Sequence, residues 1–371
     1  MSTLNKLHRR LGFAKAADLR WFLLPTIPML IFILLRLPIV SVKGYMCNPF
    51  NERAAPGECY WHTLPWSRYQ IGIYLHLWSV FPATLIAILQ FVPAIRTRRI
   101  GVHRFLGYIC WILGITAAVT ALMICDRSFG GSMATKLATS ILAAMCFLGH
   151  YKAYKAVKSY HLDKHREWML RTWIWMGGIL TMRPLMVLMA LTISFLVRQD
   201  IRFNAVLPCP QVFYMLTNGE DIGISNAKPD FFTTYGFECS PALGMMSTPS
   251  TVLARPNMSP LGGFEAILAD ARATIGANLI SRRTDFRAAA LDLSFGPAFL
   301  LGIAINAIIV EWYLRKTSNE AQRLQKLGAI KRKLVERKKE VNSEKLDEHP
   351  YKQSVRLPEP ERLRSNVLLL K

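Results

Sequence analysis

Arg183 is a charged residue near the centre of an apolar segment that is long enough to cross a membrane. A guanidinium in hydrocarbon costs at least about 2.5–3.5 kcal/mol, so such a residue normally faces a protein interior, a water-filled cavity or a ligand. Counting from the charges that bracket each segment places His76 roughly 9 Å from the membrane centre, within reach of a long arginine side chain. A guanidinium can hold an anionic group, and an imidazole can exchange a proton near neutral pH.

The predicted ligand-binding residues are His76, Gln90 and Arg183, and Gln90 is included because it shares one helix face with His76. Small and polar residues at spacings of three and four give the second apolar segment one inward face: His76, Ser79, Ala83, Ala87 and Gln90. The third segment repeats the pattern with His103, Gly107, Cys110, Gly114 and Ala121. We expect the two faces to pack together. A plain interhelical seam is the alternative explanation for Gln90, Gly107 and Gly114.

Arg183 has no carboxylate within the second to fifth segments, and the nearest in depth are Asp126 and Asp292 at the outer boundary. Its counter-charge could therefore be a ligand carboxylate, a phosphate or a haem propionate. The alternative is that Arg183 binds backbone carbonyls freed where Pro184 and a Gly-Gly pair loosen its helix.

A second group of basic residues opens the helices on the other side of the membrane: His103, Arg104, His165, Arg166 and Arg171. Helix N-termini combined with arginines bind anions such as lipid headgroups or diphosphates, so these are predicted anion-binding residues. The competing explanation is the general excess of Lys and Arg on cytoplasmic loops. An Asp-rich magnesium motif is missing from the sequence, which weakens a prenyl-diphosphate hypothesis.

The composition identifies the elements that must position these residues. The chain has 371 residues, of which 52% are hydrophobic and 19% charged, and the apolar residues form long runs. Each run, the fourth together with its flanking small residues, can supply roughly the 20 residues needed to cross the hydrocarbon. The runs are 21–40, 72–95, 105–125, 137–151, 168–197 and 294–314. The fold class predicted is an all-α polytopic membrane bundle of six transmembrane helices.

The net charge of +22 is concentrated in the N-terminal segment, the links near residues 100 and 160, and the tail. By the positive-inside rule we expect both termini to be cytoplasmic. We expect the protein in the membrane of the endoplasmic reticulum or in the plasma membrane. We expect membrane lipid and no nucleic acid as a partner. The predicted organisation is a cytoplasmic segment 1–20, a membrane domain 21–314 with an external loop 198–293, and a basic cytoplasmic tail 315–371.

Four cysteines fall on the oxidising side by this topology: Cys47, Cys59, Cys209 and Cys239. Two disulfides, Cys47–Cys59 and Cys209–Cys239, are the simplest pairing because each closes a local loop, although connectivity does not follow from sequence. No metal site is predicted. In the external loop, apolar residues at helical spacing between 264 and 279 predict one short amphipathic helix.

His76, Gln90, Arg96, His103-Arg104 with Gly107-Tyr108, and His165-Arg166-Glu167-Trp168-Met169-x-Arg171 followed by Arg183 resemble an uncharacterised family of predicted membrane proteins found in bacteria and fungi. The resemblance covers roughly residues 70–197, the family-like core. The additional first helix, the cysteine-bearing loop and the basic tail resemble the fungal members. The resemblance implies a compact bundle around these polar residues, and it brings no established activity.

These observations support three classes of function. The first is a site at mid-membrane for an anionic, amphiphilic small molecule, for example in a membrane enzyme of lipid or secondary metabolism. The second is electron transfer by a b-type haem, with histidines as axial ligands and arginines on the propionates. The third is a non-enzymatic membrane scaffold. The sequence contains no Walker loop, dinucleotide fingerprint, H-E-x-x-H motif or nucleophile elbow.

Overall fold

The computed structural model describes residues 3–13, 15–48, 51–216, 234–235, 238–239 and 271–347. The helices within this part are α1 (Thr3–Leu11), α2 (Ala16–Arg36), η1 (Leu37–Val40), η2 (Val42–Met46), α3 (Glu58–Thr63), α4 (Arg68–Gln90), α5 (Pro93–Arg98), α6 (Ile100–Ile124), η3 (Ser128–Gly130), α7 (Met133–Lys158), α8 (Leu162–Met176), α9 (Gly178–Val197), α10 (Cys209–Leu216), α15 (Thr284–Lys316) and α16 (Ser318–Asp347). The strands are β1 (Cys47–Asn48), β2 (Asn51–Glu52), β3 (Asn204–Pro208) and β4 (Arg272–Gly276).

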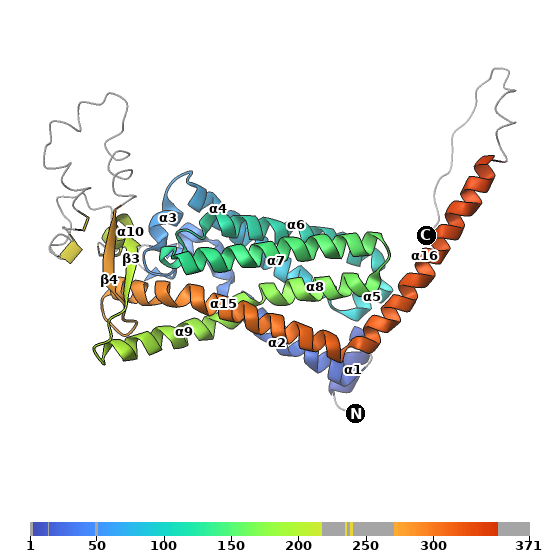
Figure 1. Cartoon of the computed structure of the whole chain (residues 1–371), viewed down its shortest axis with the longest axis horizontal. Coiled ribbons are helices and arrows are strands. Elements are labelled where there is room, and N and C mark those ends of the chain that lie inside the picture. Colours follow the sequence, from blue (N-terminus) through green and yellow to red (C-terminus); the bar gives the residue numbers. More distant parts are fainter. Residues whose placement is uncertain are drawn as a thin grey trace, which may run out of the picture.

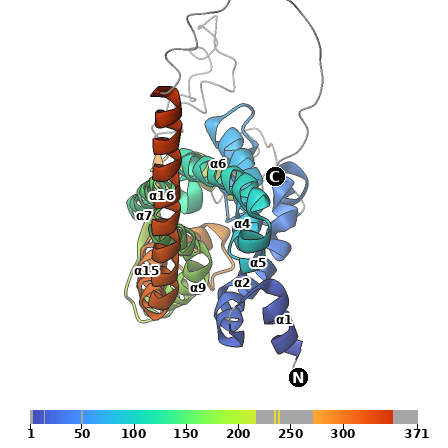
Figure 2. The same cartoon turned by 90° about the vertical axis from the view of Figure 1, so that its right-hand side faces the viewer.

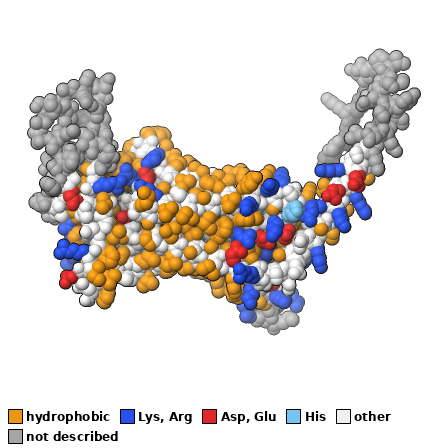
Figure 3. Space-filling model, viewed as in Figure 1, with side chains coloured by type: hydrophobic (Ala, Val, Ile, Leu, Met, Phe, Trp, Pro, Cys, Tyr) orange, Lys and Arg blue, Asp and Glu red, His pale blue; other side chains and the backbone are white. Residues whose placement is uncertain are grey.

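Six helical segments are long and apolar enough to span a membrane, which confirms the predicted polytopic helix bundle. They run side by side along the long axis of the molecule in Figure 1. Apolar side chains form a belt around the middle of the visible surface, and charged side chains collect at its two ends (Figure 3). This distribution is what a bilayer requires, because hydrocarbon contacts the belt and water the ends.

The two ends of the bundle differ in what they carry. One end holds α3, α10 and both disulfides, Cys47–Cys59 and Cys209–Cys239, and is called the disulfide end. The other holds α1, α5 and the start of α16, and is called the basic end. Figure 2 views the molecule from the basic end, where α16 projects beyond the bundle.

The predicted polar faces of α4 and α6 pack against each other. The thiol of Cys110 donates to the carbonyl oxygen of Ala83 at 3.3 Å, which fixes the two helices at a close approach. Ser79, Ala83 and Gln90 are buried, as expected for an inward face. Small side chains allow this approach, and the prediction that the two faces meet is confirmed.

The fifth membrane segment is interrupted at Gly177, where α8 ends and α9 begins. Asn306 of α15 lies against the interruption. Its Nδ2 donates to the carbonyl oxygen of Ile174 at 2.7 Å, and its Oδ1 accepts from the hydroxyl of Thr181 at 2.9 Å. The two halves have different main partners, since α8 packs chiefly on α7 and α9 on α15. A backbone carbonyl freed inside the bundle is thus satisfied by a side chain from another helix.

The disulfide end carries two small antiparallel sheets, β1 with β2 and β3 with β4. In β4, Ala273 and Ile275 are buried and alternate with more exposed residues, which is the period of a strand. Residues 272–276 therefore form a strand, and the predicted amphipathic helix over 264–279 is wrong there. Pairing with β3, from Asn204 opposite Gly276, overrides the weak helical spacing. Residues 264–270 lie outside the described part of the chain.

The orientation of the bundle is a prediction that rests on the basic loops. With both termini cytoplasmic, a cysteine introduced at Gly101 should react with an impermeant maleimide only after permeabilisation. Gly101 suits this purpose because a side chain there meets no atom within 4 Å. The matched site at the disulfide end is the exposed Arg202, and Cys110, Cys125 and Cys146 are replaced first because they are the free thiols. Labelling of the Gly101 position in intact cells would reverse the orientation.

Candidate functional site

Arg183 of α9 makes no hydrogen bond to any described residue, and its Nε is buried without a partner. The carbonyl of Ile174 at the interruption of its helix is bound by Asn306, which removes the need for Arg183 there. Its guanidinium carbon lies 5.8 Å from the ring centroid of Phe129 in η3. The geometry therefore favours a ligand-facing or charge-pairing role for Arg183 over the capping of its own helix.

Glu58 is the carboxylate in electrostatic range of Arg183. It opens α3 at the disulfide end, is 7% exposed, and accepts a hydrogen bond from the backbone amide of Phe129 at 2.8 Å. Burial raises the pKa of Glu58, and the Phe129 amide and Arg183 lower it in part. The carboxylate of Glu58, which lies outside the membrane-spanning segments, partly neutralises the charge of Arg183, which lies within one of them.

A second cation shares this region. Arg36, at the end of α2, is half-buried and lies within electrostatic range of Arg183. Arg183 therefore has one cation, Arg36, and one carboxylate, Glu58, within electrostatic range among the described residues. Like charges at this depth repel, and an additional anion would relieve the repulsion.

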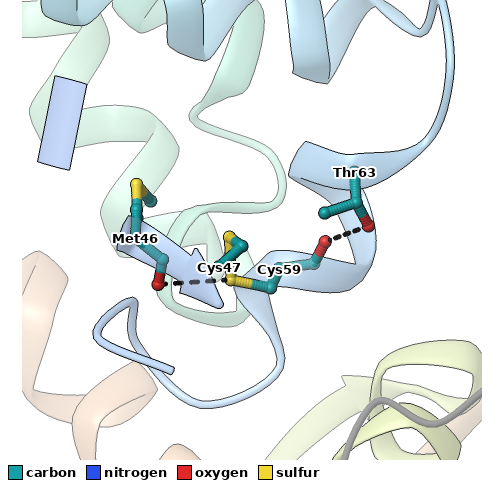
Figure 4. The surroundings of a disulfide bond; sticks show 4 residues. All are labelled: Met46, Cys47, Cys59 and Thr63. Atoms are coloured by element: carbon teal, nitrogen blue, oxygen red, sulfur yellow. Dashed lines mark hydrogen bonds between the residues drawn. A yellow bond between two sulfur atoms is a disulfide. The ribbon is translucent and has the colours of Figure 1, made fainter. Parts of the chain in front are cut away.

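The Cys47–Cys59 disulfide fixes the carboxylate component of this group. It joins β1 to the second residue of α3, directly after Glu58 (Figure 4). The carbonyl of Cys59 also accepts from the hydroxyl of Thr63 at 2.7 Å, which closes the turn of α3. The disulfide predicted from sequence thus positions a site residue that the sequence did not reveal.

The two carboxylates considered from sequence as partners of Arg183 are engaged elsewhere. Asp126 accepts hydrogen bonds from Arg68 and from the hydroxyl of Tyr69, the latter at 3.0 Å. Asp292 accepts from the backbone amide of Ser132 at 3.3 Å. Neither is in a described contact with Arg183. The expectation that they were the closest counter-charges is corrected by Glu58, which lies in α3, outside the membrane-spanning helices.

His76 and Gln90 do not join Arg183. The Nδ1–H of His76 donates to the carbonyl of Ala117 at 3.0 Å, which seats the ring against α6. Gln90 lies about 21 Å further along α4, given the rise of a helix, and faces Gly107 near the basic end. Among the described residues, the structure gives no contact between His76 and Arg183. The three predicted ligand-binding residues therefore occupy three separate surroundings.

The predicted anion-binding residues of the basic end also divide into groups. Arg171 is neutralised by Glu311, with Nε to Oε1 at 2.6 Å, and by Glu167 at 3.5 Å. Arg104 is exposed. By contrast, His103 lies within electrostatic range of His165 and of Arg96.

Arg166 joins this second group through the junction of α15 and α16. Its Nη2 donates to the hydroxyl of Thr317 at 2.8 Å, and its guanidinium carbon lies 5.9 Å from the ring centroid of Tyr313. Arg96 reaches the same junction, with Nη2 3.5 Å from Glu320. The paired His-Arg motifs, far apart in sequence, thus converge beneath the start of the tail helix.

Three residues of these two groups were missed by sequence reasoning: Arg36, Glu58 and Glu320. Arg36 looks like an ordinary interfacial charge, and Glu320 like part of a solvated tail. The signal for Glu58 was its position beside Cys59 in a loop that a disulfide was expected to fold back on the bundle.

Comparison with known proteins supports the core of the bundle. Residues 73–207 match the model of a family described as a predicted membrane protein (DUF2306), a domain of unknown function. No curated protein and no solved structure matches the chain. The matched stretch contains Arg183 and the paired His-Arg motifs, whereas Arg36, Glu58 and Glu320 lie outside it.

Proposed function

We propose that this integral multi-pass membrane protein binds the anionic group of an amphiphilic small molecule at Arg183, with Arg36 as a second cation. The observation that carries the proposal is the buried Arg183 Nε, which has no hydrogen-bond partner in the described part of the chain. Buried polar atoms are nearly always paired, so an unpaired guanidinium atom next to a second arginine indicates a missing acceptor.

The surroundings favour a ligand with an apolar tail. Arg36 ends α2, whose buried residues are only Leu19, Thr26 and Ile33, so most of this helix faces outward. Its outward side chains include Leu34 and Leu35, which are 67% and 72% exposed. A hydrocarbon chain beside α2 would remain in contact with lipid while its charged end reached the two arginines.

Glu58 acts as an internal competitor in this proposal. Its carboxylate occupies the positive field of Arg183, so an incoming anion must share or displace that interaction. Because burial raises the pKa of Glu58, acidification neutralises it more readily than an exposed glutamate. Anion binding should therefore strengthen as the pH falls through the pKa of Glu58. His76 serves the packing of α4 on α6 and is not part of the site.

A b-type haem receives less support from the geometry. His150 has a buried Nε2 without a described partner, but this atom lies 3.2 Å from the position of a β-carbon on Gly114. His76 likewise packs on the backbone of α6. Nδ1 of His76 and Nε2 of His150 thus each face the backbone of α6, and neither nitrogen is directed at an open position for a haem iron. An absorption spectrum of the purified protein tests this directly, since a Soret band would restore the haem hypothesis.

The anion site is tested by thermal unfolding of the detergent-purified full chain with dodecyl phosphate or dodecanoate below their micellar concentrations. Arg183→Gln should weaken the apparent affinity about tenfold or more, the value of one charge-assisted hydrogen bond. Glu58→Gln should strengthen it and remove the part of its pH dependence that comes from Glu58, because the competing charge is gone while the acceptor for Phe129 is retained.

Arg198→Gln is the matched control, since Arg198 lies at the exposed end of the same helix. Dodecanol supplies the same tail without the charge and should give no response that depends on Arg183. Equal shifts with dodecyl phosphate in wild type, Arg183→Gln and Arg198→Gln would exclude the site.

A further inference from the structure

We infer that the basic end holds a second, separate site for a phosphate-type oxyanion, formed by Arg96, His103 and Arg166, and that Glu320 of the tail helix occupies part of this site as a built-in carboxylate. The site brings together α5, α6 and α8 beneath the junction of α15 and α16. It is independent of the site proposed at Arg183.

The two arginines of this site point at one short stretch of chain. Arg96 Nη2 lies 3.5 Å from Glu320, and Arg166 Nη2 donates to Thr317 at 2.8 Å. Thr317 lies between α15 and α16, and Glu320 lies in the first turn of α16 with its backbone amide donating to the carbonyl oxygen of Thr317 at 3.1 Å, so both guanidiniums face the same turn. His103, at the first turn of α6, lies within electrostatic range of Arg96.

Three buried polar atoms around this position have no partner among the described residues: Nη1 of Arg166, Nδ1 of His103 and Nε2 of Gln90. Gln90 is only 9% exposed, and its Oε1 lies 3.7 Å from the β-carbon position of Gly107. Gly107 follows His103 by one turn on the same face of α6, so Gln90 and His103 lie at neighbouring levels. Buried polar atoms are normally paired, and unpaired ones from three helices indicate a polar occupant.

The charge balance identifies the class of occupant. Glu320 lies in the field of three arginines, Arg323, Arg96 and Arg166. One carboxylate leaves positive charge uncompensated, and a phosphomonoester would supply the remaining negative charge and several acceptor oxygens. A guanidinium binds phosphate through paired hydrogen bonds, whereas a lysine ammonium acts as a point charge. Two arginines at this site therefore favour a phosphate group as the occupant. The position at the end of the apolar belt suits either a lipid headgroup or free phosphate.

The test uses the full chain with inorganic phosphate in detergent, and with nanodiscs that contain phosphatidic acid or, at equal charge density, phosphatidylglycerol. Thermal unfolding reports binding. Arg166→Gln should reduce the apparent phosphate affinity about tenfold, and Glu320→Gln should raise it, because the internal competitor is removed. Arg166→Lys keeps the charge and should retain part of the affinity. This variant therefore still tests the site if Arg166→Gln fails to fold.

Lys158→Gln is the matched control, because it removes a basic residue of the same end that is not in the site. A response to phosphate alone identifies a free anion, and one to phosphatidic acid alone identifies a headgroup. Equal responses to phosphatidic acid and phosphatidylglycerol, or no difference between Arg166→Gln and Lys158→Gln, would overturn the inference. Arg183→Gln should leave this response intact, so the two sites can fail separately.

Discussion

Replacing both Cys209 and Cys239 with serine should lower the free energy of unfolding by about 3.5 kcal/mol. The disulfide restricts the denatured chain, and its removal restores the conformational entropy of the loop that it closes. The disulfide spans 30 residues and joins the start of α10 to a buried position of the long loop. Replacing Cys47 and Cys59, which are 12 residues apart, should cost less, about 3 kcal/mol. Thermal or denaturant unfolding in detergent, without reductant, measures both losses.

The control for this experiment is Cys125→Ser, which removes a free and only partly buried thiol and should change stability little. Peptide mapping without reductant should recover the two linked pairs. If all four cysteines of the disulfide end are alkylated without reductant, the predicted cost disappears along with the bonds. The Cys47–Cys59 variant should in addition strengthen anion binding at Arg183, because it frees the segment that holds the competing carboxylate of Glu58.

Acidification should destabilise the disulfide end through His62. This histidine of α3 is 3% exposed, and burial lowers its pKa from 6.5 to about 4. A depressed pKa means that the unfolded chain binds the proton more tightly, so the stabilising contribution is present above pH 6.5 and is lost as the pH falls toward 4. The full difference corresponds to about 3 kcal/mol.

The contribution of His62 is isolated by comparing wild type with His62→Gln at each pH. Glu58 has a raised pKa and therefore the opposite sign, since its contribution is present at low pH and lost as the pH rises. Subtracting the two unfolding curves removes this term if the sites act independently. His161→Gln, on an exposed histidine, should leave the pH dependence unchanged. A His62→Gln variant with the same pH profile as wild type would contradict the prediction.

The membrane helices could be predicted from sequence because length and apolar composition alone determine them, and the α4–α6 seam could be predicted because small residues recur on one face. The long loop was harder. Strand β4 owes its conformation to pairing with β3, a contact about seventy residues away. Helical spacing in a short segment does not carry that information, so the predicted helix over 264–279 failed where the structure describes it.

The candidate sites were predictable in part. The burial of Arg183 and the convergence of His103 with Arg166 follow from apolar context and from the paired motifs. Their carboxylate partners do not, because Glu58 and Glu320 come from segments outside the bundle core, α3 at the disulfide end and the first turn of α16 at the basic end. The position of a residue along a membrane helix predicts its depth in the bilayer. It does not predict which residues of a connecting segment pack against it.

The junction at Gly177 has a mechanical consequence. The side chain of Asn306 bridges α8 and α9 through hydrogen bonds to the carbonyl oxygen of Ile174 and the hydroxyl of Thr181. Each such bond contributes only about 1 kcal/mol net, so rearranging them is inexpensive compared with unwinding a helix. Because Asn306 belongs to α15, a helix of 33 residues with Pro297 in its interior, a change of the angle between α8 and α9 requires either that Asn306 exchange its hydrogen bonds or that α15 move with them.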